Sequence, residues 1–433
     1  MCIQSVPGLT GKSGDNKSDD DDRLGDGLTA YRKHNSCETT LISLVEDWTL
    51  ARDDRLIVVI LSTDMSKAFD SLRPPLMLRK LKGYGFQDRA LDLLRSYLCN
   101  RLGRVPIGSV SSSWRNVKRG CPQGSVLGPL LWNMFQNDLS YNVDSALSMY
   151  ADDHQIYEKG QNMCTVLAKL QENATLATNW YDSNLLQCNL KKYQTMSIRN
   201  KSVTCGDKMC LTVNGKDIME SENLKLLGVT IDCDLDFNVH ISNICKKAGQ
   251  RIGVIMRLRN LIPTEAKLHL YKAAILPHLT YCHLVWHFCR ASDTRRLERV
   301  QERGLRAVFR DKSSSYQQLL EKANLPTLYN RRLQDICILM YKVKHNLCPR
   351  TICNMFYTNS HTYSLRQRDF HLPRFNTVTY GKHSIRYLGP KLWSKLTNRE
   401  RSAMNLKQFK THVRRLDLAN ILDGCSGCHL CNT

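Results

Sequence analysis

The stretch Tyr150-Ala151-Asp152-Asp153 places two adjacent carboxylates between an apolar segment and a polar one that begins at His154. It contains no glycine, and we expect a strand, a tight turn that carries the acids, and a returning strand. Adjacent carboxylates repel each other and are costly to bury, so such a pair usually needs a cation. Taken alone, however, an Asp-Asp pair is more often a solvated turn or a helix cap.

A third carboxylate follows the most apolar run of the chain. Residues 56–61 read Leu-Ile-Val-Val-Ile-Leu, which predicts a strand buried on both faces, and Asp64 lies at its end. An acid at the open end of a rigid strand is well placed for chemistry. A helix N-cap is the alternative, and Asp70, which precedes a Pro-Pro helix start, fits that alternative better.

If the strands that carry Asp64 and the pair Asp152-Asp153 are neighbours, three carboxylates converge. Carboxylate oxygens without His or Cys ligands favour Mg²⁺. Two such ions about 4 Å apart would clamp the attacking and leaving oxygens of a nucleotidyl transfer. The acids therefore indicate a metal-dependent transferase.

The loop between the acidic segments is rich in glycine and proline. It reads Gly120-Cys121-Pro122-Gln123-Gly124-Ser125-Val126-Leu127-Gly128-Pro129. Glycines allow the backbone to approach a ligand closely, and the N-terminus of the helix expected to follow favours anionic groups. A plain loop into a helix is the alternative.

The composition indicates a polyanionic partner. The 433 residues include 62 Lys and Arg against 40 Asp and Glu, a formal charge of +22, which points to nucleic acid. No segment has the apolar core of a signal peptide or the roughly 20 apolar residues of a membrane span. We therefore expect an intracellular protein, nuclear or cytoplasmic, without a membrane partner. The 18 scattered cysteines are expected to be reduced.

Four regions differ in composition and periodicity. Residues 1–27 are rich in Gly, Ser and Asp and are expected to be disordered. Residues 28–235 mix strands with helices, and residues 236–346 show only helical apolar stripes with cations elsewhere on each helix. Residues 347–433 are basic and less periodic, and their aromatics among cations suit single-stranded nucleic acid.

In their order and spacing, the three segments resemble the A, B and C motifs of a reverse transcriptase of the non-LTR (LINE-type) retrotransposon group. The motifs are Ser62-Thr63-Asp64-Met65-Ser66-Lys67-Ala68-Phe69-Asp70, the loop from Gly120 to Leu131, and Tyr150-Ala151-Asp152-Asp153. The resemblance implies an RNA-directed DNA polymerase that joins dNTPs to a primer 3′-OH, with an RNA template and a DNA primer or target as partners. It implies an α+β fold: a right-hand palm with partial fingers over 28–235, an all-α thumb over 236–346 and a basic C-terminal region.

The resemblance also implies roles for single residues. Asp64, Asp152 and Asp153 would bind two Mg²⁺ ions, for which Mn²⁺ can substitute, with the Met65 carbonyl as an extra ligand. Positions implied at the incoming nucleotide are Arg32, Phe69, Gln123 and Gly124; those implied at the primer or template are Tyr150, Leu227 and Gly228. Phe69 resembles the steric gate that excludes a ribose 2′-OH, with simple core packing as the alternative. Lys192 resembles the lysine that protonates the pyrophosphate leaving group, and Lys191 is its rival.

The sequence also departs from the family pattern. The chain begins almost at the Arg32 motif, so the earlier fingers strands are expected to be missing, and we find no endonuclease or ribonuclease H segment. A truncated, catalytically silent nucleic-acid-binding remnant of the same element is therefore the alternative function. The tail cysteines Cys425, Cys428 and Cys431 are more crowded than structural zinc ligands usually are, so we expect a reduced tail without zinc. The sequence does not indicate an oligomeric state.

Overall fold

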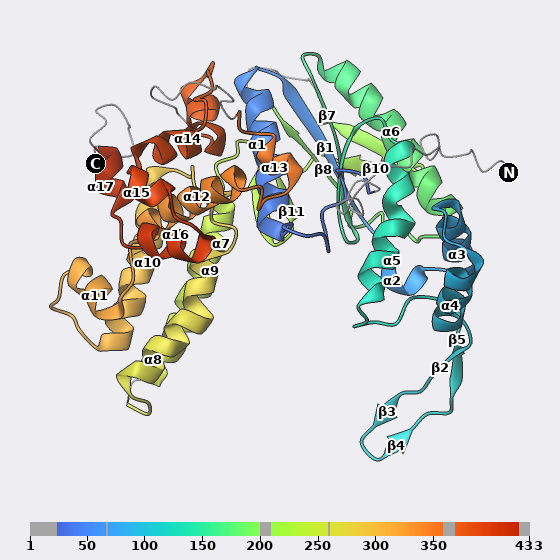
Figure 1. Cartoon of the computed structure of the whole chain (residues 1–433), viewed down its shortest axis with the longest axis horizontal. Coiled ribbons are helices and arrows are strands. Elements are labelled where there is room, and N and C mark those ends of the chain that lie inside the picture. The colour runs from blue at the N-terminus through green and yellow to red at the C-terminus, as the bar shows by residue number, and fades with distance from the viewer. Residues whose placement is uncertain (1–23, 66–67, 200–208, 259, 358–368, 424–433) are drawn as a thin grey trace.

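The structure is a computed structural model that describes residues 24–65, 68–199, 209–258, 260–357 and 369–423. A central sheet separates two groups of helices: α3 to α6 (residues 74–183) lie on one side, whereas the helix nearest the N-terminus and the helices of the chain's second half lie on the other (Figure 1). The tail cysteines and most of the segment 1–27 lie outside the described residues. Within the described part, no helix is both long and apolar enough to cross a membrane.

The sheet is antiparallel and has the strand order β6-β7-β1-β8. Its strands are β1 (Ile57–Asp64), β6 (Ala146–Tyr150), β7 (Asp153–Gly160) and β8 (Gln194–Ile198). All but the first residue of the apolar run 56–61 lies in the inner strand β1, as its sequence predicts. Val58 and Ile60 face one hydrophobic core, whereas Val59 and Leu61 face the other. Successive side chains of a strand point to opposite faces, so a strand between two cores must be apolar throughout.

Helices cover both faces of this sheet. Helix α6 (Met163–Ser183) packs against β1 and β7 on one face. Helix α1 (Cys37–Asp53) packs against β1 on the other face, and lies between the sheet and the C-terminal helices (Figure 1). Ser36 caps α1 by accepting from the Thr39 amide, which explains where the helix begins. The mixture of helices and antiparallel strands confirms the predicted α+β class.

The segment between β1 and β6 holds helices and one long arm. The helices are α2 (Ala68–Ser71), α3 (Pro74–Gly83), α4 (Asp88–Leu98), α5 (Leu127–Gln136) and the 3₁₀ turn η1 (Asn137–Tyr141). The arm consists of β2 (Arg101–Gly103), β3 (Pro106–Ile107), β4 (Val110–Ser111) and β5 (Arg115–Val117). It pairs β2 with β5 and β3 with β4, and it protrudes from the body of the molecule (Figure 1).

Two further hairpins follow the sheet. They pair β9 (Cys210–Val213) with β10 (Lys216–Met219) and β11 (Asn223–Leu226) with β12 (Val229–Asp232). The segment 226–232 is mostly apolar, and we expected a single short strand there, but the chain reverses within it. Leu227 and Gly228 turn the chain with φ of 45° and 83°, because a two-residue hairpin loop favours left-handed backbone at both positions.

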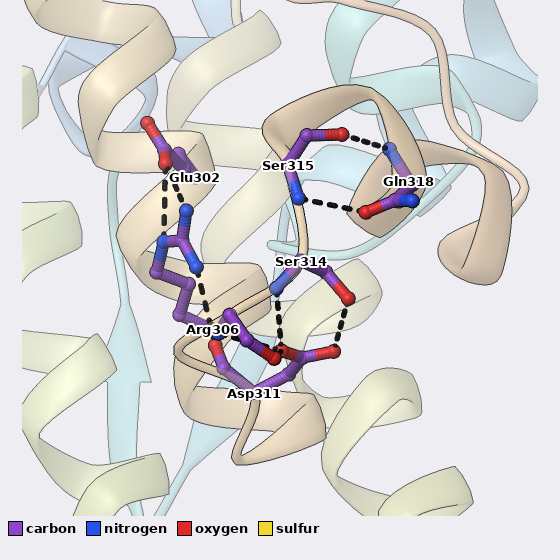
Figure 2. Close-up of polar contacts among 7 residues, drawn as sticks. Glu302, Arg306, Asp311, Ser314, Ser315 and Gln318 are labelled. Atoms are coloured by element: carbon purple, nitrogen blue, oxygen red, sulfur yellow. Dashed lines mark hydrogen bonds and ion pairs between the residues drawn. The ribbon is translucent and has the colours of Figure 1, made fainter.

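The second half of the described chain is helical. Its first group comprises α7 (Asn238–Arg257), α8 (Thr264–Leu270), the π-turn η2 (Tyr271–Ile275), α9 (Leu276–Thr280), α10 (Ala291–Phe309), α11 (Tyr316–Ala323) and α12 (Leu328–Lys344). The corner between α10 and α11 is fixed by polar contacts (Figure 2): Arg306 donates to Glu302 and to the Asp311 carbonyl, and the Asp311 carboxylate accepts from Ser314. α8 and the arm extend to the same side of the molecule (Figure 1).

The C-terminal segment is more ordered than its weak periodicity suggests. It contains α13 (Arg350–Cys353), the π-turn η3 (Val378–Lys382), α14 (Ile385–Lys395), α15 (Asn398–Arg401), α16 (Leu406–Val413) and α17 (Leu418–Asp423). Helices α14, α16 and α17 pack on α12, whereas η3 packs on α1. One hydrophobic core thus joins α1, one face of the sheet and the C-terminal helices.

Candidate active site

The sheet register brings two of the predicted acids face to face. Asp64 ends β1 and pairs directly with Asp153, the first residue of β7. Ala151 and Asp152 form the two-residue turn between β6 and β7, and Ala151 has a φ of 56°. The convergence expected from sequence thus results from strand pairing, since β1 and β7 are neighbours.

The three carboxylates share one electrostatic environment. The pKa of Asp153 rises from 3.8 to about 6, first because of burial and then because Asp152 and Asp64 repel its charge. Lys192 opposes this rise, and its Nζ lies 3.1 Å from Oδ1 of Asp64. In the described part of the chain, no three His, Cys, Asp or Glu side chains are grouped closely enough to form a ready-made metal site. The acids therefore lie side by side, and Asp64 forms an ion pair with Lys192. They do not already surround a metal position.

A buried polar network supports the acidic turn from below. His154, next to Asp153, lies 3.0 Å from Gln136 Oε1 and 3.0 Å from the Tyr181 hydroxyl. Burial lowers the pKa of His154 to about 3, so the ring is neutral. Trp132 donates its indole N–H to the Ala151 carbonyl at 2.9 Å. These contacts fix the turn to α5 and α6.

This network could hardly be predicted from the sequence. His154 is a lone histidine in a strand, and Gln136 and Tyr181 lie 18 and 27 residues away from it. The available signal was polarity within strands and helices that are otherwise apolar, since a buried polar group needs a partner.

The loop of Gln123 is joined to the segment that follows Asp64. The Gly120 amide donates to the Leu72 carbonyl at 2.6 Å, and Gln123 Nε2 donates to Asp70 at 2.8 Å. Gly120 has a φ of 79°, and a Cβ there would lie 3.0 Å from the Asp70 Cα. Asp70 lies within α2, whereas the residue at the N-cap of α3 is Arg73. The cap interpretation of Asp70 was therefore wrong, because its carboxylate binds Gln123 instead.

Phe69 and Tyr31 lie together beside the acids. The Phe69 ring is 5.2 Å from the Trp132 ring and 6.3 Å from the Tyr31 ring. Asp152 contributes to a raised pKa of Tyr31, after burial. The neighbouring Arg32 donates from its guanidinium to the carbonyls of Gly25 and Leu28. Tyr31 was not predicted from sequence, where Arg32 was the residue of this segment assigned to the nucleotide.

A cleft of about 820 Å³ is lined by Tyr150, which precedes the acidic turn, by Tyr281 and by the N-terminus of α1. The Tyr281 hydroxyl donates to the Leu227 carbonyl at 2.8 Å. A Cβ on Gly228 would lie 3.3 Å from the same ring. The Leu227-Gly228 turn is thus held by a tyrosine 54 residues away, which sequence reasoning also missed. The remaining predicted residues are Met65, which directly follows β1, and Gly124, which lies in the Gln123 loop.

Comparisons with known proteins agree with this geometry. Residues 20–231 match the family model described as reverse transcriptase (RNA-dependent DNA polymerase). The RNA-directed DNA polymerase from mobile element jockey of Drosophila melanogaster is 27% identical over 256 residues, 57% of this chain and 28% of that protein. The probable RNA-directed DNA polymerase from transposon BS of Drosophila melanogaster is 28% identical over 297 residues, 66% of this chain and 32% of that protein.

The chain thus spans about a third of the length of these curated relatives. A solved structure of apo telomerase from Candida tropicalis aligns over 71% of this chain and 51% of that chain, with a TM-score of 0.40 and 12% identity.

Proposed function

Since residues 20–231 belong to the reverse transcriptase family and are similar to its members from non-LTR mobile elements, we propose that this chain is an RNA-directed DNA polymerase. It would transfer deoxynucleotides from dNTPs to a primer 3′-OH on an RNA template. The observation that carries the proposal is the pairing of Asp64 with Asp153 beside Asp152 at one end of the sheet. The chain's formal charge of +22 suits the nucleic-acid partners.

The acidic site fits divalent cations. Its donors are carboxylate oxygens of Asp64, Asp152 and Asp153, with the Met65 carbonyl nearby, and hard cations such as Mg²⁺ or Mn²⁺ prefer oxygen ligands. The raised pKa of Asp153 indicates that the negative charge of the three acids is only partly neutralised by nearby cations of the protein. When bound, two such ions would stabilise the charge that develops on the attacking and leaving oxygens.

The incoming nucleotide would occupy the space between the acids and the Gln123 loop. Phe69, held against Trp132, would exclude a ribose 2′-OH. Gln123 and Gly124 would contact the nucleotide and template, and Arg32 would hold the triphosphate. Lys192 is well suited to protonate the pyrophosphate leaving group, because 62% of its side chain is exposed and it can turn away from Asp64.

The primer would lie toward the cleft beside Tyr150. Tyr150 would lie near the primer terminus, and the Leu227-Gly228 turn would hold the primer backbone. The Tyr281 contact supports this role, because a turn fixed by a hydrogen bond can present its amides in one position.

The test is primer extension with purified chain, an RNA template, a DNA primer, dNTPs and Mg²⁺. We expect Asp152→Asn to abolish extension, since a neutral amide removes a charged ligand. Asp144→Asn, an exposed acid just before β6, is the matched control and should extend like wild type. Extension that survives in Asp152→Asn would overturn the assignment of the acids. Template binding without extension by the wild-type chain would favour the silent remnant.

A further inference from the structure

The arm formed by β2, β3, β4 and β5 exposes the ring of a tryptophan, a residue type that is buried elsewhere in the described chain. The chain has six tryptophans, all within the described residues. Trp114 on the arm is 58% exposed, whereas the other five are at most 6% exposed. A tryptophan left in water forgoes a large hydrophobic gain, so its exposure indicates a surface that binds something.

The charge of the arm restricts the kind of partner. Between residues 101 and 119 there are five cations and no acid: Arg101, Arg104, Arg115, Lys118 and Arg119. Residues 104–119 are all exposed. The Arg104 guanidinium lies 4.8 Å from the centre of the Trp114 ring. An aromatic face with a cation beside it suits a nucleic-acid base and its phosphate.

The arm is already shaped in the free protein. The Ser112 amide donates to the Val105 carbonyl at 3.0 Å, and the Val105 amide donates to the Ser112 hydroxyl at 3.0 Å. Binding therefore need not order the hairpin, which lowers its entropic cost.

The arm is also joined to the Gln123 loop. At the arm's base, the Arg101 guanidinium donates to the carbonyls of Arg119 and Gly120. Gly120 is in turn bonded to Leu72, in the segment that follows Asp64. An occupant of the arm would thus lie on an element anchored next to the acidic site.

We propose that the arm binds a single-stranded polynucleotide, with one base stacked on Trp114 and phosphates on Arg104 and Arg115. This goes beyond the proposed function, which places nucleic acid only at the acids, the Gln123 loop and the Tyr150 cleft. A single strand is favoured over a duplex because only unpaired bases offer a free face to a lone aromatic ring. The exposed Ile107 and Val110 at the tip would suit a protein partner, but the arm's uniform positive charge favours a polyanion.

The test measures binding of the full chain to labelled 12-nucleotide U-only RNA and T-only DNA by fluorescence anisotropy. EDTA replaces divalent cations and dNTPs are omitted, so a failure of polymerisation leaves the measurement intact. We expect Trp114→Ala to weaken binding about tenfold, the loss typical of a stacked base, and Trp114→Tyr to stay near wild type. Arg115→Ala should reduce the slope of log affinity against log salt by about one.

Matched controls are Tyr141→Ala, an aromatic that is 61% exposed elsewhere, and Lys216→Ala, an exposed cation on β10. Both should bind like wild type. If Trp114→Ala weakens binding of the RNA alone, the partner is RNA. If it weakens binding of RNA and single-stranded DNA equally, the arm binds single strands in general. Either result supports the proposal. Wild-type affinity in a folded Trp114→Ala, or an equal loss for a 12-base-pair duplex, overturns it. Retention of an acidic protein by the arm without oligonucleotide binding also overturns it.

Discussion

Asp153 occupies a position that is unfavourable for an isolated carboxylate. It is partly buried, it lies opposite Asp64 on the neighbouring strand, and it directly follows Asp152 of the turn. Lys192 offsets only part of this charge. Repulsion of this kind is typical of sites whose charge serves a function rather than stability.

The raised pKa gives a test by pH. Between 3.8 and about 6 the folded chain holds the Asp153 proton more tightly than the unfolded chain. Stability should therefore fall as the pH rises through this window, and the penalty should persist above it. We expect Asp153→Asn to raise the free energy of unfolding by about 1–2 kcal/mol at pH 8 in EDTA, after allowance for solvent screening. The gain should vanish near pH 4 in urea titrations.

Mg²⁺ provides the control for this prediction. A cation that binds only the folded chain stabilises it, so Mg²⁺ should raise the melting temperature of wild type more than that of Asp153→Asn. An unchanged stability of the variant at pH 8 would contradict the repulsion.

Phe69 gives a second test for a single residue. We expect Phe69→Ala to raise ribonucleotide incorporation relative to deoxynucleotide incorporation about tenfold, because the space for a 2′-OH opens. Single-nucleotide extension with each nucleotide type measures the ratio. Phe69→Tyr keeps the bulk and should remain selective, and a Phe69→Ala chain with unchanged selectivity would support core packing as the residue's role.

At the scale of elements, the loop that carries Gln123 is fitted onto α2. Gly120 and Gly124 share nearly the same backbone, with φ of 79° and 77°. They differ in surroundings, because a Cβ at Gly120 would meet backbone atoms at 3.0–3.2 Å, whereas one at Gly124 would meet nothing within 4 Å.

Comparing alanine substitutions at Gly120 and Gly124 measures how much stability depends on the close contact between Gly120 and the Asp70 backbone. We expect Gly124→Ala to destabilise the chain by about 1 kcal/mol through backbone strain alone. Gly120→Ala should cost about 2–4 kcal/mol, since strain and overlap with the Asp70 backbone add. Urea unfolding of the two variants gives both values, and equal losses would mean that the two segments separate easily.

The elements also show what the sequence could predict. The strand of Asp64 was recognisable because six consecutive apolar residues admit few other structures, and the acid turn because strands flank it. The Leu227-Gly228 turn was not, because it is hidden in an apolar run. Tyr31 and Tyr281 were missed because their roles come from contacts across the fold, which local periodicity does not encode.

At the scale of the whole molecule, α1 holds the strap formed by residues 376–386. Glu46 accepts hydrogen bonds from the Ile385 and Arg386 amides at 2.8 and 3.2 Å, at the N-terminus of α14. Asp53 accepts from the Asn376 and Thr377 amides at 2.9 and 2.6 Å. Glu46 is buried, and burial raises its pKa despite these bonds. The strap therefore belongs to the same cooperative core as the sheet.

We expect Glu46→Ala to lower the free energy of unfolding by about 2–3 kcal/mol, because buried amides lose their acceptor. Glu172→Ala, on the exposed face of α6, should change it by no more than about 0.5 kcal/mol. Urea unfolding followed by circular dichroism measures both. Equal effects would show that the strap adds little to stability.

The hydrogen bonds between α1 and the strap also constrain how the chain folds during synthesis. The Asp53 partners lie 323 and 324 residues later in the chain. At about 5–20 residues per second, a ribosome needs roughly 16–65 s to make that length. During this interval the carboxylates of Glu46 and Asp53 must stay in water, since the amides that donate to them have not yet been made. Helix α1, the first helix of the described chain to be made, should therefore be among the last to complete its contacts, after the acidic turn has formed.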